Sequence, residues 1–464
     1  MPDPAAAVTD ENQRPGGLLE IDEAVTGDLA TLLAEDARGM VLNLVADLYP
    51  ADLALLLSRL ELEQGQKLLT WLDPARGAEA LPELDHDFRT QLLADLPATR
   101  LTVLVDALDT DDAADVLADL PEMLAVRVLP RLDDADDLNE LLGYGEETAG
   151  GIMAAEYVAV PATWSVADVT EEVRRVARMV EEVYSVFVIG EGRVLEGVVS
   201  LKKLLLSPAE RSIAEIMERD FISVTTNVDQ EEAAQVMERY DLVSMPVLDG
   251  DGHLVGRITI DDVVDVIRSE AEEDMQLMSG VSGDESPMTS LLKVSRGRLP
   301  WLVIGLAGAG LSGLVIGGFE ESLEQAVVLA TFIPIVTAMG GNAAVQSAAI
   351  TVQGITSGEL WTGDALARVG REAVVAACNG LVLAGLLCSA VAVLGVAHAG
   401  PLALTLGLTM LFVVMLASAN GALIPFGLQA LGIDPASAIG PFVTTLNDIL
   451  GLTVYFLIAS LFYL

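Results

Sequence analysis

The C-terminal third of the chain is a series of long apolar runs with very few charged residues. A helix of about 20 apolar residues crosses the ~30 Å hydrocarbon core of a bilayer, and each run is long enough to do so. The pattern therefore predicts five membrane-spanning helices, over residues 299–318, 325–351, 372–397, 402–428 and 437–463.

The first part of the chain carries a leucine–proline repeat with a period of 24 residues. Between the repeated positions run Leu- and Ala-rich stretches with helical spacing. Stacked units of this kind form solenoids, so we expect an all-α helical-repeat domain over residues 25–140. Leucine-rich helix ends could also mimic such a period. The repeated leucines are Leu48, Leu72, Leu96 and Leu120, and the prolines are Pro50, Pro74, Pro97 and Pro121.

Residues 141–267 contain β-branched runs that alternate with helical patterns. The segment 184–200 parallels the segment 243–259, which lies 59 residues later. Each copy reads as a strand, a glycine turn, a strand and a helix. Such a duplicated α/β unit resembles a pair of cystathionine-β-synthase-type (CBS) modules, which usually have a regulatory role. An amphipathic helix is expected before each copy, over 166–180 and 230–239.

The second copy also carries the pattern Gly-x-hydrophobic-Thr-x-x-Asp, which is associated with adenosine binding in CBS modules. Gly256, Thr259 and Asp262 fit it, whereas Lys203 replaces the aspartate in the first copy. ATP or another adenine nucleotide is therefore a candidate ligand of the second module only. The alternative is that Thr259 and Asp262 cap the following helix.

Charge is distributed very unevenly along the chain. The whole chain has 25 basic and 69 acidic residues, and the part before residue 299 holds all but two of the basic and eight of the acidic ones. A phosphate backbone would be repelled by such a surface, so nucleic acid is not an expected partner. Multivalent cations are a plausible partner, although acidic surfaces can also serve only solubility or a salty environment.

A connector over residues 268–298 follows the duplicated unit and continues its acidic helix. Like charges spaced three or four residues apart on a helix lie about 5–6 Å from one another and repel. A bound divalent cation would relieve this repulsion, whereas a solvated charge run would tolerate it. The crowded acids are Asp261, Asp262, Asp265, Glu270, Glu272, Glu273 and Asp274.

Asp448 is the only side chain of the last apolar run that would be charged at neutral pH. A carboxylate in the bilayer centre costs about 3 kcal/mol or more unless it faces water, a partner or an ion. The only basic residues between 299 and 464 are Arg368 and Arg371, so no obvious basic partner is available. We expect Asp448 to lie mid-helix and to line a cation pathway. The alternative is a protonated carboxyl group packed against a neighbouring helix.

Other polar or helix-weakening residues interrupt the apolar runs. In the second run, Gly340, Gly341 and Asn342 follow Pro334, and we expect them to loosen the helix and turn carbonyls toward a lumen. Asn447 directly precedes Asp448. Asn379 and Asn420 are better explained by hydrogen bonds between helices.

The scarcity of ligands favours Mg²⁺ as the permeating ion. Mg²⁺ keeps much of its hydration shell and is held by one or two carboxylates. Zinc and copper prefer nitrogen or sulfur ligands, and the apolar region offers few: its one histidine, His398, is expected in an external loop. A single carboxylate per chain suggests a symmetric dimer that doubles it around a shared axis.

Basic residues orient the predicted spans. Lys293, Arg296 and Arg298 precede the first span, and Arg368 and Arg371 lie between the second and third. Loops rich in Lys and Arg face the cytoplasm. We therefore expect a multi-pass protein of the inner (plasma) membrane, with cytoplasmic N-terminal domains and the C-terminus outside. Residues 1–24 have no apolar leader and are expected to form a disordered tail.

Several motifs together resemble the MgtE-type magnesium channel/transporter family, over nearly the whole chain from about residue 25. This resemblance implies a multi-domain fold: the all-α N-domain, tandem CBS modules, a connector (plug) helix and a five-helix transmembrane pore domain over 299–464. Ala344 and Gly440 depart from residues found in many members. The motifs are Thr148–Met153, Phe332–Pro334, Gly340-Gly341-Asn342 with Gln346-Ser347, Gly432–Ala436, and Asn447-Asp448 with Gly451.

The resemblance also implies site residues. It implies a homodimer in the lipid membrane whose pore is lined by the second and fifth spans, with Asp448 recognising hydrated Mg²⁺. The ion-pathway candidates are Asp448, Asn447, Asn342, Gly340, Gly341 and Asp434. The candidate metal ligands besides Asp448 are Asp111, Asp115, Asp229, Glu231, Asp241, Asp262, Asp265, Glu270, Glu273 and Asp274.

The function expected from these features is passive Mg²⁺ uptake, closed by intracellular Mg²⁺ bound between the N-domain, the CBS modules and the connector. One alternative is a transporter of another divalent cation, such as Co²⁺ or Zn²⁺. Another is a membrane sensor that binds Mg²⁺ or nucleotide without conducting. We do not expect an enzyme, because no nucleophile–base arrangement or phosphate-binding loop is present in the sequence.

Overall fold

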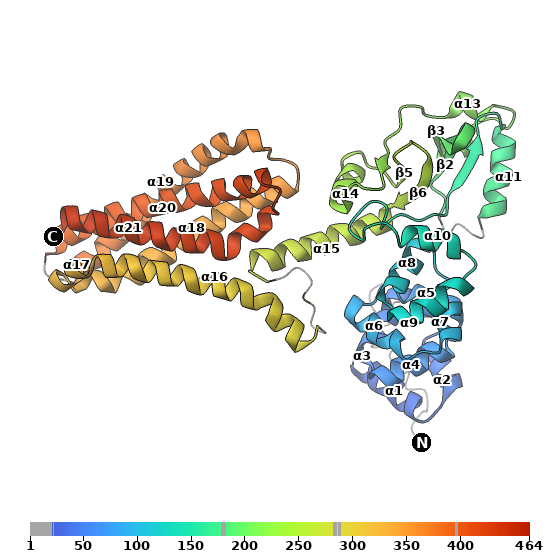
Figure 1. Cartoon of the computed structure of the whole chain (residues 1–464), viewed down its shortest axis with the longest axis horizontal. Helices are drawn as coiled ribbons and strands as arrows, with labels where there is room; N and C mark the ends of the chain where they lie inside the picture. The colour runs from blue at the N-terminus through green and yellow to red at the C-terminus, as the bar shows by residue number, and fades with distance from the viewer. Residues whose placement is uncertain (1–20, 22, 178–181, 282–284, 286–288, 395–397) are drawn as a thin grey trace, which may run out of the picture. The chain divides into compact units, whose positions relative to one another are not determined.

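The computed structural model describes residues 21, 23–177, 182–281, 285, 289–394 and 398–464, coloured in Figure 1. The expected disordered tail lies almost wholly outside these residues. The chain divides into two compact units, Met1–Ile267 and Arg268–Leu464, and each is described by itself.

The first unit begins with a stack of short helices (Figure 1). In this stack, α4, α6 and α8 pack in one row and α5, α7 and α9 in another, which is the two-row arrangement of a helical solenoid. The helices are α1 Glu23–Ala34, α2 Arg38–Leu44, α3 Pro50–Arg59, α4 Leu62–Trp71, α5 Pro74–Glu79, α6 His86–Ala94, α7 Ala98–Val105, α8 Thr110–Asp119, α9 Glu122–Val128 and α10 Ala135–Leu141.

The leucine–proline repeat marks where helices of this stack begin. Pro50 and Pro74 are the first residues of α3 and α5, a position where the missing N–H of proline leaves no bond unmade. Pro97 and Pro121 directly precede α7 and α9. The four leucines are 5–7% exposed. In each repeat the proline therefore marks the start of a helix, and the leucine packs in the core.

A pair of arginines, also 24 residues apart, links successive helical repeats of the stack. Arg100 Nη2 donates to the carbonyl oxygen of Leu72, at 2.7 Å, and Arg76 Nη2 donates to that of Leu48, at 2.6 Å. Each guanidinium thus donates hydrogen bonds to carbonyl oxygens at a helix end of the preceding repeat.

Two small sheets follow, and they confirm the duplication. The strand orders are β1-β2-β3 and β4-β5-β6, each with one parallel and one antiparallel pair. Ser185 pairs with Ser200, and Ser244 pairs with Thr259. The strands are β1 Val158–Pro161, β2 Ser185–Ile189, β3 Leu195–Ser200, β4 Val224–Thr225, β5 Ser244–Leu248 and β6 Leu254–Thr259.

Helices cover these sheets at the expected places. The expected helix over 230–239 is α14, Gln230–Arg239. The one expected over 166–180 is α11, Val166–Val176, and residues 178–181 lie outside the described part. One continuous apolar core joins the helical stack to the second sheet, through side chains such as Met153, Met245 and Val263. The remaining helices are α12 Leu201–Leu206, α13 Ile213–Ile216 and α15 Ile260–Met278, with short 3₁₀ turns η1 at Leu129–Arg131 and η2 at Glu191–Arg193.

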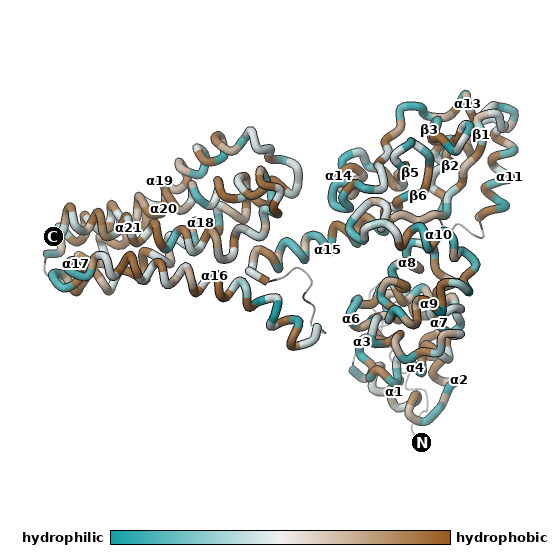
Figure 2. The backbone as a smooth tube through the Cα atoms, viewed as in Figure 1, coloured by the Kyte–Doolittle hydropathy of each residue, from teal (hydrophilic) through white to brown (hydrophobic). Residues whose placement is uncertain are grey.

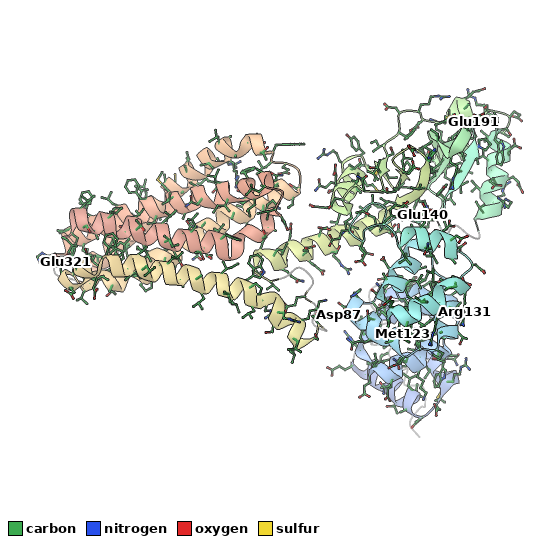
Figure 3. All side chains as sticks on the ribbon, viewed as in Figure 1. Asp87, Met123, Arg131, Glu140, Glu191 and Glu321 are labelled. Carbon is green, nitrogen blue, oxygen red and sulfur yellow. The ribbon has the colours of Figure 1, made fainter. Side chains whose placement is uncertain are left out.

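Within its described residues, the second unit contains five helices long and apolar enough to cross a membrane. Figure 2 shows hydrophobic brown segments along them, and teal at the first turns of α16, which carry Lys293, Arg296 and Arg298. The short α17, where Glu321 is labelled in Figure 3, lies between the first two. The elements are α16 Leu291–Gly318, α17 Glu320–Gln325, α18 Val328–Thr356, η3 Thr362–Asp364, α19 Ala365–Leu394, α20 Ala399–Ala430, η4 Pro435–Ala438, η5 Ile439–Val443 and α21 Thr444–Phe462.

The glycine pair of the second span does not break its helix, contrary to the expectation from sequence. α18 is continuous from Val328 to Thr356. Gly340 is buried, and a Cβ there would lie 3.0 Å from Cγ1 of Val413 on α20. A Cβ at Gly421 of α20 would collide with the backbone carbonyl of Ala344. The small residues therefore allow close helix packing.

The last span is less regular than expected. A 3₁₀ turn and a π-helical turn, η4 and η5, precede α21. Pro441 within η5 has no N–H to donate to a regular helix. Asp448 consequently lies one turn after the start of α21, not at the middle of a long helix.

Candidate metal sites

An acidic cluster forms in the first unit where α8 meets the start of α15. It brings together Asp111, Asp112 and Asp115 of α8 with Asp262 of α15, since the charge of Asp262 raises the pKa of all three. Sequence predicted Asp111, Asp115 and Asp262 as ligands but missed Asp112. Four carboxylates on two helices offer the oxygen ligands that Mg²⁺ and Ca²⁺ prefer.

Burial and mutual repulsion disfavour ionisation throughout this acidic cluster. Burial, then the charges of Asp262 and Asp112, raise the pKa of Asp111 well above its usual value. Burial and neighbouring acids raise the pKa of Asp112 to about 7. Loss of hydration raises the pKa of Asp115 and of Asp262 to about 6. A cation that binds here would displace protons and remove the repulsion.

Glu156 fixes α8 against the β-rich part of the first unit. Its carboxylate accepts from Thr110 N, at 3.0 Å, and from Thr110 Oγ1, at 2.7 Å. Thr110 Oγ1 in turn accepts from Ala155 N, at 2.8 Å. A carboxylate from 46 residues away therefore caps the start of α8, where negative charge is favoured. Sequence gave no indication of this role for Glu156.

Arg89 is a positive group that faces this acidic cluster. Its Nε donates to Oδ2 of Asp119, at 2.5 Å, and its Nη1 donates to the carbonyl of Leu81, at 3.3 Å. Both charged side chains of this pair are nearly buried. The guanidinium lowers the pKa of Asp112 and of Asp115, which partly offsets the effect of burial. Sequence analysis did not single out Arg89.

Three of the predicted ligands lie at the ends of α14. Asp229 Oδ1 accepts from Glu231 N, at 2.9 Å, so Asp229 caps that helix. Glu231 Oε1 accepts from Gln235 Nε2, at 3.2 Å. Asp241 follows the helix with a φ of 52°, a conformation in which aspartate is tolerated. No contact described for Asp229 or Asp241 joins either of them to the acidic cluster. Asp265 and Glu273 lie on α15.

A second group of acids forms in the second unit. Burial, then the charges of Asp434 and Glu270, raise the pKa of Asp274 to about 6. Asp434 Oδ1 also accepts from Ala436 N, at 2.8 Å, at the start of η4. The structure thus brings together Glu270 and Asp274, expected as ligands, with Asp434, expected in the ion pathway.

The end of α15 packs against the segment that precedes α21. Leu277 and Met278 join a core with Ala436, Ile439 and Val443. A Cβ at Gly440 would lie 3.2 Å from Cα of Gly280, so the two backbones are in close contact. The acidic group around Asp274 therefore lies beside this apolar contact.

Asp448 has no hydrogen-bond or ion-pair partner among the described residues. It is half-buried. The adjacent Asn447 is buried, and its Nδ2 donates to the carbonyl of Val443 in its own helix, at 2.8 Å. The carboxylate of Asp448 is therefore available to an ion, whereas the amide of Asn447 is occupied within the chain.

Asn342 lies elsewhere in the second unit. It lines a cavity between α18, α19 and α20, whose lining does not include Asp448. Gly340 faces α20, and Gly341 is partly exposed. Within one chain, the structure does not bring Asn342 and Asp448 into the same cavity.

The adenosine-type pattern also has structural roles in this chain. Thr259 Oγ1 donates to Oδ2 of Asp262, at 2.6 Å, so these residues cap the start of α15. A Cβ at Gly256 would lie 2.6 Å from the sulfur of Met153 and 2.9 Å from the carbonyl of Ala154. Asp262 thus belongs both to this pattern and to the acidic cluster.

Comparison with known families and proteins gives consistent matches. A divalent cation transporter family (MgtE) matches residues 333–458, an MgtE intracellular N domain matches 48–147, and CBS domains match 149–210 and 213–269. The chain is 36% identical over 332 residues to "Magnesium transporter MgtE" of Enterococcus faecalis, covering 71% of this chain and 72% of that protein.

Two further comparisons agree. The identity to "Magnesium transporter MgtE" of Thermus thermophilus is 36% over 328 residues, covering 70% of this chain and 72% of that protein. A crystal structure of the cytosolic domain of the Mg²⁺ channel MgtE in complex with ATP aligns with a TM-score of 0.50 and 35% identity, over 52% of this chain and 99% of that one. From its motifs, its fold and these matches, the chain belongs to the MgtE family of divalent cation transporters.

Proposed function

We propose that this protein is a Mg²⁺ channel that takes up magnesium across the cell membrane and closes when intracellular Mg²⁺ is plentiful. The observation that carries the proposal is the carboxylate of Asp448, which has no partner in the described part of the chain and lies in a helix long and apolar enough to span a membrane. An ionisable group held at membrane depth without a partner is a mark of an ion pathway. The relatives named as magnesium transporters support the choice of ion.

The proposal includes a homodimer in which two copies of Asp448 face a shared axis. Two carboxylates around one axis suit hydrated Mg²⁺, which is bound through one or two of them with several waters retained. The N-terminal domains lie in the cytoplasm and the C-terminus outside, because the basic residues at the starts of α16 and α19 would then be cytoplasmic.

Closure by Mg²⁺ follows from the electrostatics of the two acidic groups. The cluster around Asp262 and the group around Asp274 both consist of carboxylates that resist ionisation together. Mg²⁺ would neutralise them and hold α8 and the end of α15 in place, with Leu277 and Met278 packed against the segment that precedes α21. Without Mg²⁺, repulsion would release the end of α15. An adenine nucleotide at the second CBS module is a further proposed ligand, as the ATP complex of the related cytosolic domain suggests.

The test is Mg²⁺ flux into liposomes that contain the purified chain. Asp448→Ala should abolish flux while the protein still elutes as the folded species in gel filtration. Glu321→Gln on the exposed α17 serves as the matched control and should leave flux unchanged. Unchanged flux in Asp448→Ala would refute the pore role. Flux of Co²⁺ or Zn²⁺ that exceeds that of Mg²⁺ under competition would assign a different ion.

A further inference from the structure

A cavity of about 610 Å³ opens between α18, α19 and α20, and its lining includes Asn342 but not Asp448, the residue on which the proposed ion pathway rests. α18 and α19 both pack along α20, and Val414 and Ser418 of α20 form its floor. Ser347 Oγ donates to the carbonyl of Ser418, at 2.9 Å, and joins α18 to α20 behind it. The lining residues Gln346 and Val375 are exposed, so the cavity is open at the surface between α18 and α19.

The two basic residues of the membrane region both line this cavity. Arg368 and Arg371 are the only Lys or Arg residues after Arg298. With Glu372, the only acid in the lining, they give the cavity a net positive charge. This positive charge would repel Mg²⁺, whereas it would attract an anion.

The guanidinium of Arg368 is incompletely paired, because its Nε has no acceptor among the described residues. Its Nη2 lies 2.8 Å from Oε1 of Glu372, and the Arg368 side chain is only 10% exposed. Within the described residues, neither Nε nor Nη2 of Arg368 donates a hydrogen bond with proper alignment. Buried donors left unsatisfied are costly, so an acceptor from outside the chain would stabilise this arrangement.

The cavity is charged at one end and apolar along the rest of α19, as a phospholipid is charged at its head and apolar along its chains. Arg368 and Arg371 lie in the first two turns of α19, whereas Val375, Val382 and Leu383 follow deeper in the same helix. At a rise of ~1.5 Å per residue, Val382 lies about 16 Å beyond Arg371 along the helix axis. The charged end and the apolar wall thus match a phosphate head with an attached acyl chain.

We propose that this cavity binds an anionic phospholipid, with its phosphate on Arg368 and Arg371 and an acyl chain along α19. Placing it in the cytoplasmic leaflet rests on the proposed orientation of the chain. The planar guanidinium presents paired donors that suit phosphate oxygens. Gln346, on the facing wall, is placed to donate to the glycerol esters. Basic pockets between membrane helices on the cytoplasmic side bind anionic head groups in general.

The experiment measures lipid retention by native mass spectrometry of the full chain, with dioleoyl phosphatidylglycerol and dioleoyl phosphatidylcholine as probes. The wild type should retain phosphatidylglycerol in preference. The double variant Arg368→Gln, Arg371→Gln should bind it about 30-fold more weakly, since each basic residue near a membrane surface contributes about a factor of five. The matched control Arg296→Gln removes a basic residue beside the first span that does not line the cavity, and should retain the lipid.

A charge-preserving variant separates lost binding from lost folding. Arg368→Lys, Arg371→Lys should keep most of the preference for phosphatidylglycerol. Three results would overturn the proposal: equal retention of both lipids by the wild type, unchanged retention in the Gln double variant, or full displacement by soluble glycerol phosphate, which would indicate a free-anion site. Disulfide cross-linking between copies through Val375→Cys, with no lipid retained, would instead show that a second copy fills the cavity and would also overturn it. None of these readouts depends on Mg²⁺ flux, so failure here leaves the channel proposal untouched.

Discussion

Replacing Asp262 with asparagine should stabilise the first unit when divalent cations are absent. The pKa of Asp262 is raised from 3.8 to about 6, mainly by burial. The folded protein therefore holds a proton that the unfolded chain releases near pH 4, and its stability falls as pH rises from about 4 to 6. Above about pH 6, the free energy of unfolding is reduced by the full cost of burying the charged carboxylate of Asp262.

The magnitude follows from the size of that shift. One pKa unit corresponds to 1.36 kcal/mol, so about two units give at most about 3 kcal/mol. In Asp262→Asn this penalty is absent, and an amide oxygen can still accept the hydrogen bond from Thr259 Oγ1. For a domain of about 250 residues, 2–3 kcal/mol corresponds to a rise in melting temperature of about 5–10 °C.

The assay is thermal unfolding of residues 21–278, which contain the continuous core of the first unit and the whole of α15. At pH 8 with a chelator, Asp262→Asn should melt higher than the wild type, and Mg²⁺ should stabilise it less. At pH 4.5 the difference in stability should shrink to about 1 kcal/mol, because that pH lies only about 0.7 unit above the unfolded-state pKa of 3.8 and the folded protein still holds the proton on Asp262. The control Glu191→Gln, on an exposed turn labelled in Figure 3, should behave as the wild type. An equal melting temperature at pH 8, or an equal gain from Mg²⁺, would refute the reasoning.

Two further substitutions test features of the two units. Arg89→Gln should destabilise residues 21–278 by about 3–5 kcal/mol in urea unfolding at pH 7, because it leaves the buried Asp119 with only the exposed His86 as a partner. Asp119→Asn in the same chain should recover part of the loss, and an unchanged midpoint would contradict the role of the Arg89–Asp119 pair. Gly421→Ala should destabilise the full chain in detergent by about 1–3 kcal/mol, because its methyl group would meet the backbone of Ala344. Gly427→Ala, which has open space around it, should melt at or slightly above the temperature of the wild type, because alanine is the better helix former.

The elements that sequence predicted well are those with a repeated pattern. The 24-residue period gave the helix starts at Pro50 and Pro74, and the 59-residue duplication gave two sheets with the same strand order. The spans were evident from length and apolarity alone. The predicted ends of the spans were less accurate. The first span was predicted to begin at residue 299, whereas α16 begins at Leu291 and includes the basic residues before that position.

What sequence could not supply depends on contacts between distant residues. Gly340 looked like a helix-weakening residue, because a glycine in sequence does not show whether a neighbouring helix requires its small size. Glu156 reaches α8 from 46 residues away, and Asp274 meets Asp434 only through the fold. Asp112 could have been found, since it lies three residues before Asp115 on one helix face.

The arginine links of the helical stack also determine where the first unit should come apart. Arg100 hydrogen-bonds its own repeat to the preceding repeat, and Arg76 does the same. The stability of each repeat therefore depends on its contacts with its neighbours. At α8 the series ends in the Glu156 hydrogen bonds and in a core shared with the second sheet. Fraying should therefore start at α1 and advance toward α8, so that the carboxylates around Asp262 are the last part of the stack to lose their arrangement.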